Sequence, residues 1–323
     1  MPVHAFVFPG QGSQFVGMGA DLAAAFAPAR EVLQEVDDVL GQKLARLMAE
    51  GPAETLMLTE NAQPALMALS IAVLRVLESE GGFTLADRAV LVAGHSLGEY
   101  SALAAAGTLT IADAARLLRQ RGQAMQSAVA PGEGAMAALL GVELEAAAAI
   151  CADAALLTHD DGRTETQVVA PANDNGGGQV VISGHRVAVE RAIALAKTRG
   201  VKRAMLLPVS APFHCALMAP AATIMADRLG EATLTPPTVP LIANVTAGRV
   251  TDPDTIRARL VEQVTGLVRW RESVLAMRAM GVDSLLELGA GKVLTGLTRR
   301  IDPELRGAAA GSPAEIDAML KGM

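Results

Sequence analysis

The segment that most constrains the fold is Gly94-His95-Ser96-Leu97-Gly98-Glu99, in which two glycines flank a serine with the spacing G-x-S-x-G. The apolar run 89–93 before it predicts a buried strand, and residues 100–107 after it predict a short helix that stops at a glycine. This order is typical of a nucleophile elbow, a tight turn that projects the serine hydroxyl from its tip. We therefore predict that Ser96 is a nucleophile. The alternative is a coincidental turn in which Ser96 only caps the helix.

A nucleophilic serine needs a base, and the chain has five histidines that could supply one. They are His4, His95, His159, His185 and His214. His95 is next to Ser96, and neighbours on a tight turn point apart, so we expect it to pack beside the elbow. We expect His4 and His159 to be solvated, and His185 lies in a turn with no evident partner. His214 ends segment 208–214, where two prolines fix the backbone and can aim an imidazole, so it is the predicted base.

A second glycine-rich turn, Gly10-Gln11-Gly12-Ser13-Gln14, follows an apolar strand pattern near the N-terminus. It does not fit the dinucleotide fingerprint G-x-G-x-x-G, because the third glycine would fall at Phe15. Enzymes that form an acyl-serine often bind the oxyanion with one N–H after the nucleophile and one N–H from a separate early loop. The predicted pair of donors is Leu97 and Gln11.

Arg121 is the candidate for recognition of an anion. Residues 111–126 predict a helix, with Thr110 as its N-cap and Asp113 three residues on. The apolar residues of this helix are spaced so that Arg121 lies on its apolar face. A buried arginine needs an anionic partner. That partner is either a substrate carboxylate, held by two hydrogen bonds, or an Asp or Glu of the same chain.

Four motifs in this order resemble one family: GQGSQ at 10–14, GHSLGE at 94–99, RGQAMQ at 121–126 and APFH at 211–214. The chain resembles the bacterial malonyl-CoA:acyl carrier protein transacylases of type II fatty acid synthesis, which are related to the acyltransferase domains of polyketide synthases. The resemblance extends from Phe6 to about residue 300 and includes a C-terminal signature at 285–294.

The resemblance implies further roles. The arginine that matches Arg121 holds the malonyl carboxylate, and a backbone carbonyl near the residue that matches Gln263 orients the histidine. Asn244 matches a position near the site. Phe213 resembles the phenylalanine that precedes the histidine in malonyl-type enzymes. Asn175 belongs to a loop that borders the family's cleft, although Gly177 replaces the family's proline there.

Composition and sequence patterns argue against several other classes of protein. The net charge of −7 argues against nucleic-acid binding. We find no uninterrupted apolar run of the ~18 residues that span a bilayer, and no secretory signal is evident, so we expect a cytoplasmic protein without a membrane partner. Cys151 and Cys215 predict neither a disulfide framework nor a metal site and are expected to pack in the interior. We expect no cofactor, with malonyl-CoA as a substrate.

The pattern of elements predicts one unit inserted into another. Residues 1–130 and 204–323 alternate strand and helix patterns. Residues 131–203 predict the order β-α-β-β-α-β, which is ferredoxin-like. The predicted strands are 135–142, 167–170, 179–183 and 203–207, and the predicted helices are 143–155 and 186–198. Residues 156–166 form a polar insert. The resemblance implies the same α/β plan, an α/β-hydrolase-like core with an inserted ferredoxin-like subdomain.

These observations predict a ping-pong malonyltransferase that moves malonyl from malonyl-CoA to the phosphopantetheine thiol of an acyl carrier protein through Ser96. The alternative enzyme is a serine hydrolase or thioesterase on acyl-CoA. That class normally has its histidine near the C-terminus, whereas more than a hundred residues follow His214. A third possibility is a subunit that binds carrier protein without turnover, against which Ser96, Arg121 and His214 argue.

Overall fold

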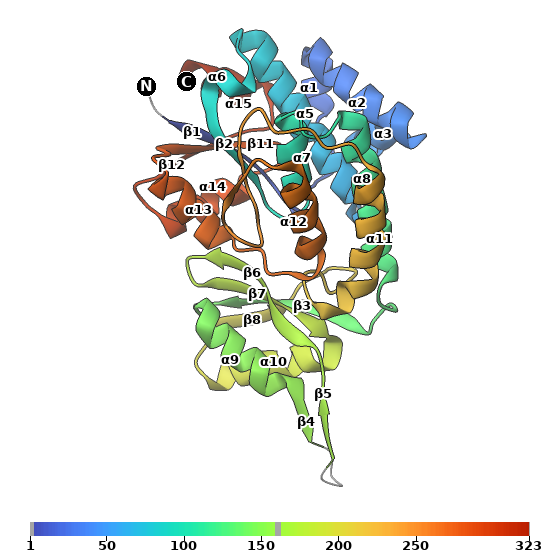
Figure 1. The fold of residues 1–323 in the computed structure, drawn as a ribbon, viewed down its shortest axis with the longest axis vertical. Helices are drawn as coiled ribbons and strands as arrows, with labels where there is room; N and C mark the ends of the chain where they lie inside the picture. Colours follow the sequence, from blue (N-terminus) through green and yellow to red (C-terminus); the bar gives the residue numbers. More distant parts are fainter. Residues whose placement is uncertain (1–2, 159–162, 323) are drawn as a thin grey trace.

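The computed structural model describes residues 3–158 and 163–322 and has a mixed α/β fold with two main sheets (Figure 1). The larger sheet has six strands in the order β10-β9-β2-β1-β11-β12, and all neighbours are parallel except β10 and β9. Its strands are β1 (His4–Phe8), β2 (Ala89–Gly94), β9 (Leu241–Ile242), β10 (Arg249–Val250), β11 (Ser284–Leu288) and β12 (Arg306–Ala310).

Both faces of the larger sheet are covered, as a central parallel sheet requires. Successive side chains of a strand point to opposite faces. Phe6 and Phe8 of β1 therefore join the core cluster of the long helix α5 (Thr59–Gly81), while Ala5 and Val7 join a second cluster with α13 (Trp270–Ala279) and α14 (Val293–Ile301). The strand β1 is thus buried throughout, and its C-terminal end leads directly to the predicted oxyanion loop.

Helices form the rest of this larger part of the molecule. In chain order they are α1 (Ala20–Ala25), α2 (Ala27–Leu40), α3 (Leu44–Glu50), α4 (Ala53–Met57), α6 (Leu85–Arg88), α7 (Gly98–Ala105), α8 (Ile111–Ser127), the 3₁₀ turn η1 (Ala216–Met218), α11 (Ala219–Glu231), α12 (Pro253–Thr265) and α15 (Pro313–Gly322). The prediction for α8 is confirmed, since the Thr110 side chain accepts a hydrogen bond from the Asp113 N–H at 3.0 Å.

Helix α5 is long and apolar enough to cross a membrane by length and composition. The search for an uninterrupted apolar run missed it because polar side chains such as Gln63 and Ser70 interrupt the pattern. In the structure, 83% of its most apolar window is buried inside the molecule. It packs against α2 and α8, so this helix belongs to the protein core.

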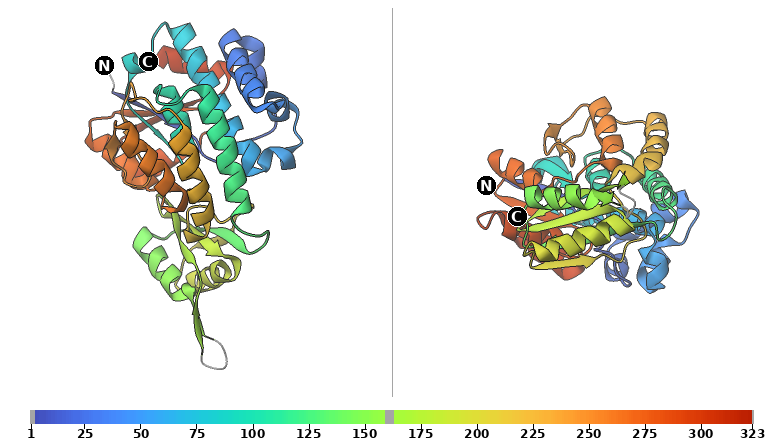
Figure 2. Two further views of the ribbon diagram at one scale, coloured as in Figure 1. Left: turned by 45° about the vertical axis from the view of Figure 1, so that its right-hand side comes forward. Right: turned by 90° about the horizontal axis from the view of Figure 1, so that it is seen from below.

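The smaller sheet has four antiparallel strands in the order β6-β7-β3-β8. They are β3 (Gly134–Leu140), β6 (Val169–Gly176), β7 (Gln179–His185) and β8 (Arg203–Leu206). Helices α9 (Leu144–Ala155) and α10 (Arg186–Thr198) cover its outer face, away from the larger sheet (Figure 2). Cys151 is buried in this layer, as expected.

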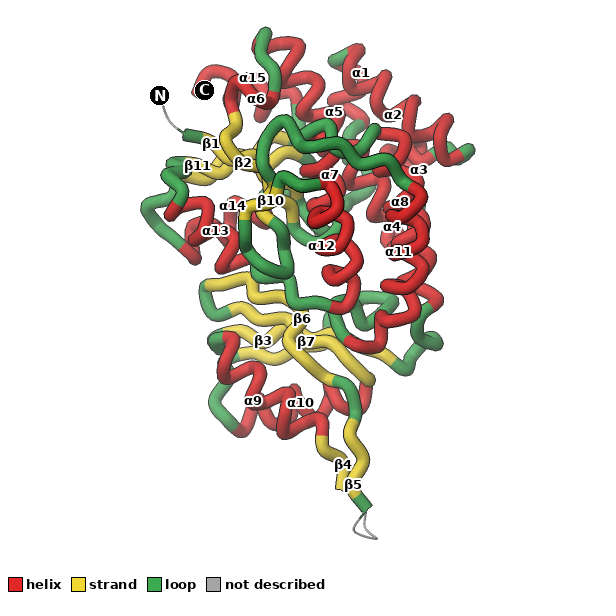
Figure 3. The backbone as a smooth tube through the Cα atoms, in the orientation of Figure 1, coloured by secondary structure: helices red, strands yellow, loops and turns green. Residues whose placement is uncertain are grey.

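The strand predicted at 167–170 begins later and runs further than expected. Two irregularities in the pairing with β7, at Pro171/Asn173 and Asp174/Gly176, carry β6 on to Gly176. Asn173 also bridges to Val268, in the loop after α12, so β6 lies beside the larger part of the molecule (Figure 3). Pairing along both edges explains why a segment that reads as a glycine-rich turn is a strand.

The described residues of the polar insert 156–166 include two short antiparallel strands that project from the smaller sheet (Figure 1). Its strands are β4 (Leu156–Thr158) and β5 (Thr164–Thr166). The prediction for His159 lies outside the described residues.

Two predictions about histidines are wrong. His4 is buried, and its Nδ1 shares a 2.5 Å hydrogen bond with the Ser284 hydroxyl of the neighbouring strand. The apolar strand around it takes the ring into the interior, and this burial lowers the His4 pKa. His185 ends β7, and its Nδ1 accepts the Val168 N–H at 2.9 Å. It therefore has a structural partner on the adjacent segment.

Candidate active site

Ser96 lies on a strained turn between β2 and α7. Its φ of 54° falls in the left-handed region that residues with a side chain rarely adopt. Steric overlap excludes side chains at the two flanking glycines. A Cβ on Gly94 would overlap the backbone of Gly98, and a Cβ on Gly98 would overlap the Phe8 carbonyl oxygen. The sequence therefore folds into an elbow that packs tightly against the end of β1 and leaves Ser96 partly exposed.

His214 lies within hydrogen-bond distance of the serine. Its Nε2 is 2.7 Å from Ser96 Oγ, and its Nδ1 is 2.8 Å from the backbone oxygen of Gln263. Because a carbonyl oxygen only accepts, Nδ1 carries the proton and donates it, and Nε2 is left to accept from the serine hydroxyl. This is the tautomer that a general base needs.

Burial lowers the pKa of His214 to about 3, and the nearby Arg121 charge contributes to the same shift. The imidazole is therefore neutral at physiological pH. His214 itself has a φ of 60°, so the loop that carries it is held in an uncommon backbone conformation.

Arg121 is the largest polar residue buried at the site, with 1% of its surface exposed. Its Nη1 donates to Gln63 Oε1 at 2.7 Å, and its Nη2 donates to Gln263 Oε1 at 2.8 Å and to Ser96 Oγ at 3.1 Å. All of these partners are neutral, and the Nε group finds no acceptor among the described residues. In residues 3–158 and 163–322, no carboxylate bonds directly to Arg121, although the charge of the buried Glu99 favours the charged guanidinium from behind Gln263.

A buried cation without a directly bonded counter-ion is costly, and burial lowers the pKa of Arg121. The Tyr100 ring beneath the guanidinium, 5.7 Å from its centre, offers partial compensation through a cation–π contact. The site is therefore electrostatically prepared for a negatively charged ligand beside Ser96.

The predicted oxyanion donors, Gln11 and Leu97, lie on adjoining segments. The His95 N–H donates to the Phe8 carbonyl at 3.0 Å, and this bond ties the elbow to the strand that leads to Gln11. The Gln11 side chain accepts from the Thr59 hydroxyl at 2.5 Å, which anchors the loop to α5. Among the described residues, no protein acceptor is found for the Gln11 N–H or for the Leu97 N–H.

Asn244 and Gln263 brace the turn itself. Asn244 Oδ1 accepts from the Ser96 N–H at 2.8 Å, and Asn244 Nδ2 donates to the Gly94 carbonyl at 2.6 Å. Gln263 Nε2 donates to the Ser96 carbonyl at 3.0 Å. Both residues thus contact the nucleophile's backbone.

The remaining predicted residues lie around this centre. Asn175 accepts from His95 Nε2 at 2.9 Å, so it contacts the elbow next to Ser96. His95 packs on the Trp270 ring, and burial lowers its pKa, in keeping with the expected packing role. Phe213 is buried in the main core cluster. Cys215 is also buried, and its thiol donates to the Pro212 carbonyl.

Sequence reasoning missed two polar residues of the site, Gln63 and Glu99. Gln63 is 1% exposed in the otherwise apolar helix α5, and a polar residue inside an apolar run was the available signal. Glu99 has a fully buried side chain, and the available signal was its place in the GHSLGE motif.

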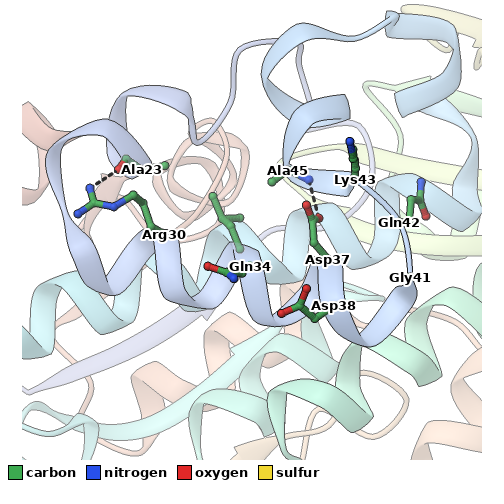
Figure 4. Close-up of a pocket in the computed structure, with 10 residues that line it drawn as sticks. Ala23, Arg30, Gln34, Asp37, Asp38, Gly41, Gln42, Lys43 and Ala45 are labelled. Carbon is green, nitrogen blue, oxygen red and sulfur yellow. Dashed lines mark hydrogen bonds between the residues drawn. The ribbon is translucent and has the colours of Figure 1, made fainter.

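A separate hollow lies elsewhere, between α2 and α3. Figure 4 shows two of its polar side chains bonded to backbone groups: Arg30 donates to the Ala23 carbonyl, and Asp37 accepts from the Ala45 N–H. It contains none of the predicted site residues. In residues 3–158 and 163–322, no group of three or more His, Cys, Asp or Glu side chains could hold a metal ion.

A mixed α/β fold with an elbow serine, a hydrogen-bonded histidine and two free N–H groups defines the class of enzymes that transfer acyl groups through a serine ester. Comparisons with known proteins show which family of this class the chain belongs to. The model of the acyl transferase domain family matches residues 5–309.

Individual relatives agree. The chain is 49% identical to the malonyl CoA-acyl carrier protein transacylase of Escherichia coli K12, over 99% of this chain and 100% of that protein. Its fold matches the crystal structure of acyl-carrier-protein-S-malonyltransferase from Bartonella henselae with a TM-score of 0.93 and 53% identity, over 99% of both chains. It also matches a malonyl-transacylase solved in complex with a type II polyketide synthase acyl carrier protein, with a TM-score of 0.93, 44% identity and coverage of 99% and 100%. The chain belongs to the acyl transferase family, within its group of malonyl CoA-acyl carrier protein transacylases.

Proposed function

We propose that this enzyme transfers the malonyl group of malonyl-CoA to the phosphopantetheine thiol of acyl carrier protein and so supplies malonyl units for fatty acid synthesis. One observation carries the proposal: Ser96 Oγ lies 2.7 Å from His214 Nε2 and 3.1 Å from a buried guanidinium that is bonded directly to no carboxylate of the described chain. The hydrolase alternative is not supported, because the family model and the relatives are acyl transferases.

In the first half-reaction, His214 Nε2 takes the Ser96 proton as the oxygen attacks the thioester carbonyl. The Gln263 carbonyl holds the proton on Nδ1 and stabilises the imidazolium that forms. The Gln11 and Leu97 N–H groups bind the developing oxyanion. When the carbon–sulfur bond breaks, His214 returns the proton to the coenzyme A sulfur, and malonyl remains as an ester on Ser96.

Arg121 selects the acyl group. It binds the free carboxylate of malonyl, which acetyl lacks, and this pairing supplies a directly bonded counter-ion. A bidentate bond to the carboxylate needs two adjacent N–H groups of Arg121, and its Nη2 already donates to Ser96 and Gln263. Binding of the carboxylate therefore releases Ser96 Oγ from Arg121.

In the second half-reaction, the carrier protein's thiol gives its proton to His214 and attacks the ester carbonyl. The same N–H groups bind the oxyanion, and the Ser96 oxygen leaves with the proton from His214. Asn244 keeps the turn in shape throughout, while Phe213 and Asn175 line the acyl site beside the base and the elbow. No cofactor takes part in either half.

The finer architecture is also a proposal. We assign residues 1–130 and 204–323 to an α/β-hydrolase-like catalytic subdomain and residues 131–203 to a ferredoxin-like subdomain. Numbered within the smaller sheet, the strand order is 4-1-3-2 with antiparallel neighbours, which supports the second assignment. A cytoplasmic location agrees with a pathway that uses coenzyme A thioesters.

Radiolabelled malonyl-CoA tests this function. With the enzyme alone, we expect a stable malonyl-protein and release of coenzyme A in a single turnover. With added carrier protein, the label should move to the carrier's thiol. Release of free malonate in place of transfer would support a hydrolase, and binding of carrier without label transfer would support a non-enzymatic subunit.

A further inference from the structure

Glu99 is a buried carboxylate next to the site that the chemistry above does not use. It lies in the first turn of α7, three residues after Ser96, and none of its surface is exposed. Its Oε2 accepts from Gln263 Nε2 at 2.6 Å and from the Asn244 N–H at 3.2 Å. Its Oε1 has no partner among the described residues. Burial of a carboxylate is energetically unfavourable, and this one binds the two residues that brace the nucleophile.

Gln263 connects Glu99 to both reactive side chains. Its backbone oxygen accepts from His214 Nδ1, and its side-chain Oε1 accepts from Arg121 Nη2. Its Nε2 faces three acceptors, which are Glu99 Oε2, the Ser96 carbonyl and, at 3.4 Å, Asn244 Oδ1. One residue therefore touches the base, the guanidinium and the nucleophile.

The direction of the Gln263 amide decides whether this arrangement works. If the amide turned by 180°, its NH₂ would meet the N–H of Arg121, and its oxygen would meet three acceptors. An ionised carboxylate only accepts hydrogen bonds, so Glu99 is compatible with just one of the two directions. It is also the only charged acceptor of the three, and charge-assisted bonds are the stronger ones.

We propose that Glu99 is a positioning residue that fixes the direction of the Gln263 amide and thereby holds Arg121 in place to bind the malonyl carboxylate. This inference rests on the proposed function. Glu99 acts through Gln263, and its effect should fall on the selection of malonyl over acetyl more than on acyl transfer itself.

The sharpest test is Glu99→Gln, which keeps the size but replaces two acceptors with one acceptor and one donor. Gln263 is then free to take either direction, and the wrong one repels Arg121. We expect the ratio of Ser96 acylation rates with malonyl-CoA and acetyl-CoA to fall about tenfold, the size of a lost charge-assisted bond. The acetyl rate should fall less than the malonyl rate, because acetyl has no carboxylate for Arg121 to bind.

Glu287→Gln is the matched control. Glu287 is a second fully buried glutamate, and it accepts the Leu294 and Thr295 N–H groups at the start of α14. Within the described residues, it makes no hydrogen bond to the site residues named above. Its replacement should lower thermal stability and leave the malonyl-to-acetyl ratio unchanged.

A double-mutant cycle with Gln263→Ala shows whether Glu99 acts through Gln263. This variant removes the amide but keeps the backbone oxygen that accepts from His214. In the Gln263→Ala background, Glu99→Gln should change the malonyl-to-acetyl ratio of acylation rates by less than about twofold.

The parent enzyme gives an independent readout, which also serves if Glu99→Gln does not fold. Burial raises the pKa of Glu99 to about 7, and a protonated carboxyl carries a donor just as an amide does. The malonyl-to-acetyl ratio should therefore fall as pH drops through about 7. The other titratable groups near Glu99 do not interfere. Burial lowers the pKa of His214 to about 3 and lowers the pKa of His95 below its ordinary 6.5, whereas burial raises the pKa of Tyr100. The Arg121 guanidinium stays charged.

Three results would overturn the inference: equal loss with both donors in Glu99→Gln, a tenfold effect that persists in Gln263→Ala, or a ratio in the parent that does not change between pH 6 and 8. A rise of the ratio in Glu99→Gln would also contradict it and would mean that Glu99 repels the substrate carboxylate. Malonylation of the parent enzyme tests the proposed function separately, so the two ideas fail in different experiments.

Discussion

Arg121 and His214 bind the same oxygen atom. Arg121 Nη2 lies 3.1 Å and His214 Nε2 lies 2.7 Å from Ser96 Oγ. Before substrate binds, His214 accepts the hydrogen bond of the Ser96 hydroxyl while the guanidinium donates to the same oxygen. The same guanidinium disfavours a second positive charge on His214, and the pKa of the histidine is lowered in part for that reason. A malonyl carboxylate that pairs with Arg121 relieves this repulsion at the moment when the base must take a proton.

Replacement of Arg121 should separate the two donors. Arg121→Ala removes the partner of the malonyl carboxylate, a loss of about 10²-fold or more in kcat/KM for malonyl-CoA, because hydrogen bonds to charged groups contribute about 1.5–3 kcal/mol each. Acetyl transfer should be spared or raised. The rates of Ser96 acylation with the two donors measure this, and equal losses would mean that Arg121 has a structural role only.

The dependence of acetyl transfer on pH should also change in Arg121→Ala. In the parent enzyme, the lowered pKa of His214 keeps the base neutral, so kcat/KM for acetyl-CoA should show no loss from this histidine between pH 7 and about 5. Removal of the positive charge raises the pKa of His214 toward its ordinary value of 6.5, and the acid limb should move to higher pH. An acid limb at the same pH in both enzymes would show that Arg121 does not act on the base.

The elbow glycine Gly98 should tolerate no side chain. Gly98→Ala places a Cβ against the Phe8 carbonyl, so the turn must move, and both acylation and thermal stability should fall. Gly230→Ala is the control, since its Cβ would meet nothing within 4 Å and it lies in the helix α11. That variant should be as stable as the parent or more stable by up to about 1 kcal/mol. Full activity in Gly98→Ala would contradict the geometry of the elbow.

The sequence predicted the parts of the site that depend on local pattern. The strand, the two glycines and the following helix identified the elbow, and the spacing of apolar residues placed Arg121 on the buried face of α8. The prolines before His214 indicated a rigid loop, and the structure brings that imidazole to Ser96 across 118 positions of sequence.

The parts that depend on long-range contact could not be predicted in this way. His4 reads as a polar residue near a chain end, but pairing of β1 with β11 buries it against Ser284. The strand β6 extends through Asn173 only because Val268 pairs with it from another part of the chain. The direction of the Gln263 amide follows from Glu99 and Arg121, which lie 164 and 142 positions away.

The most direct test of the account is the site of the acyl group. The intact enzyme is mixed with malonyl-CoA, quenched, weighed by mass spectrometry and mapped by peptide analysis. We predict one malonyl group on Ser96 in the parent enzyme, none in Ser96→Ala, and acylation slowed by about 10²–10⁴-fold in His214→Ala. A malonyl ester on another residue, or labelling that persists in Ser96→Ala, would contradict the account.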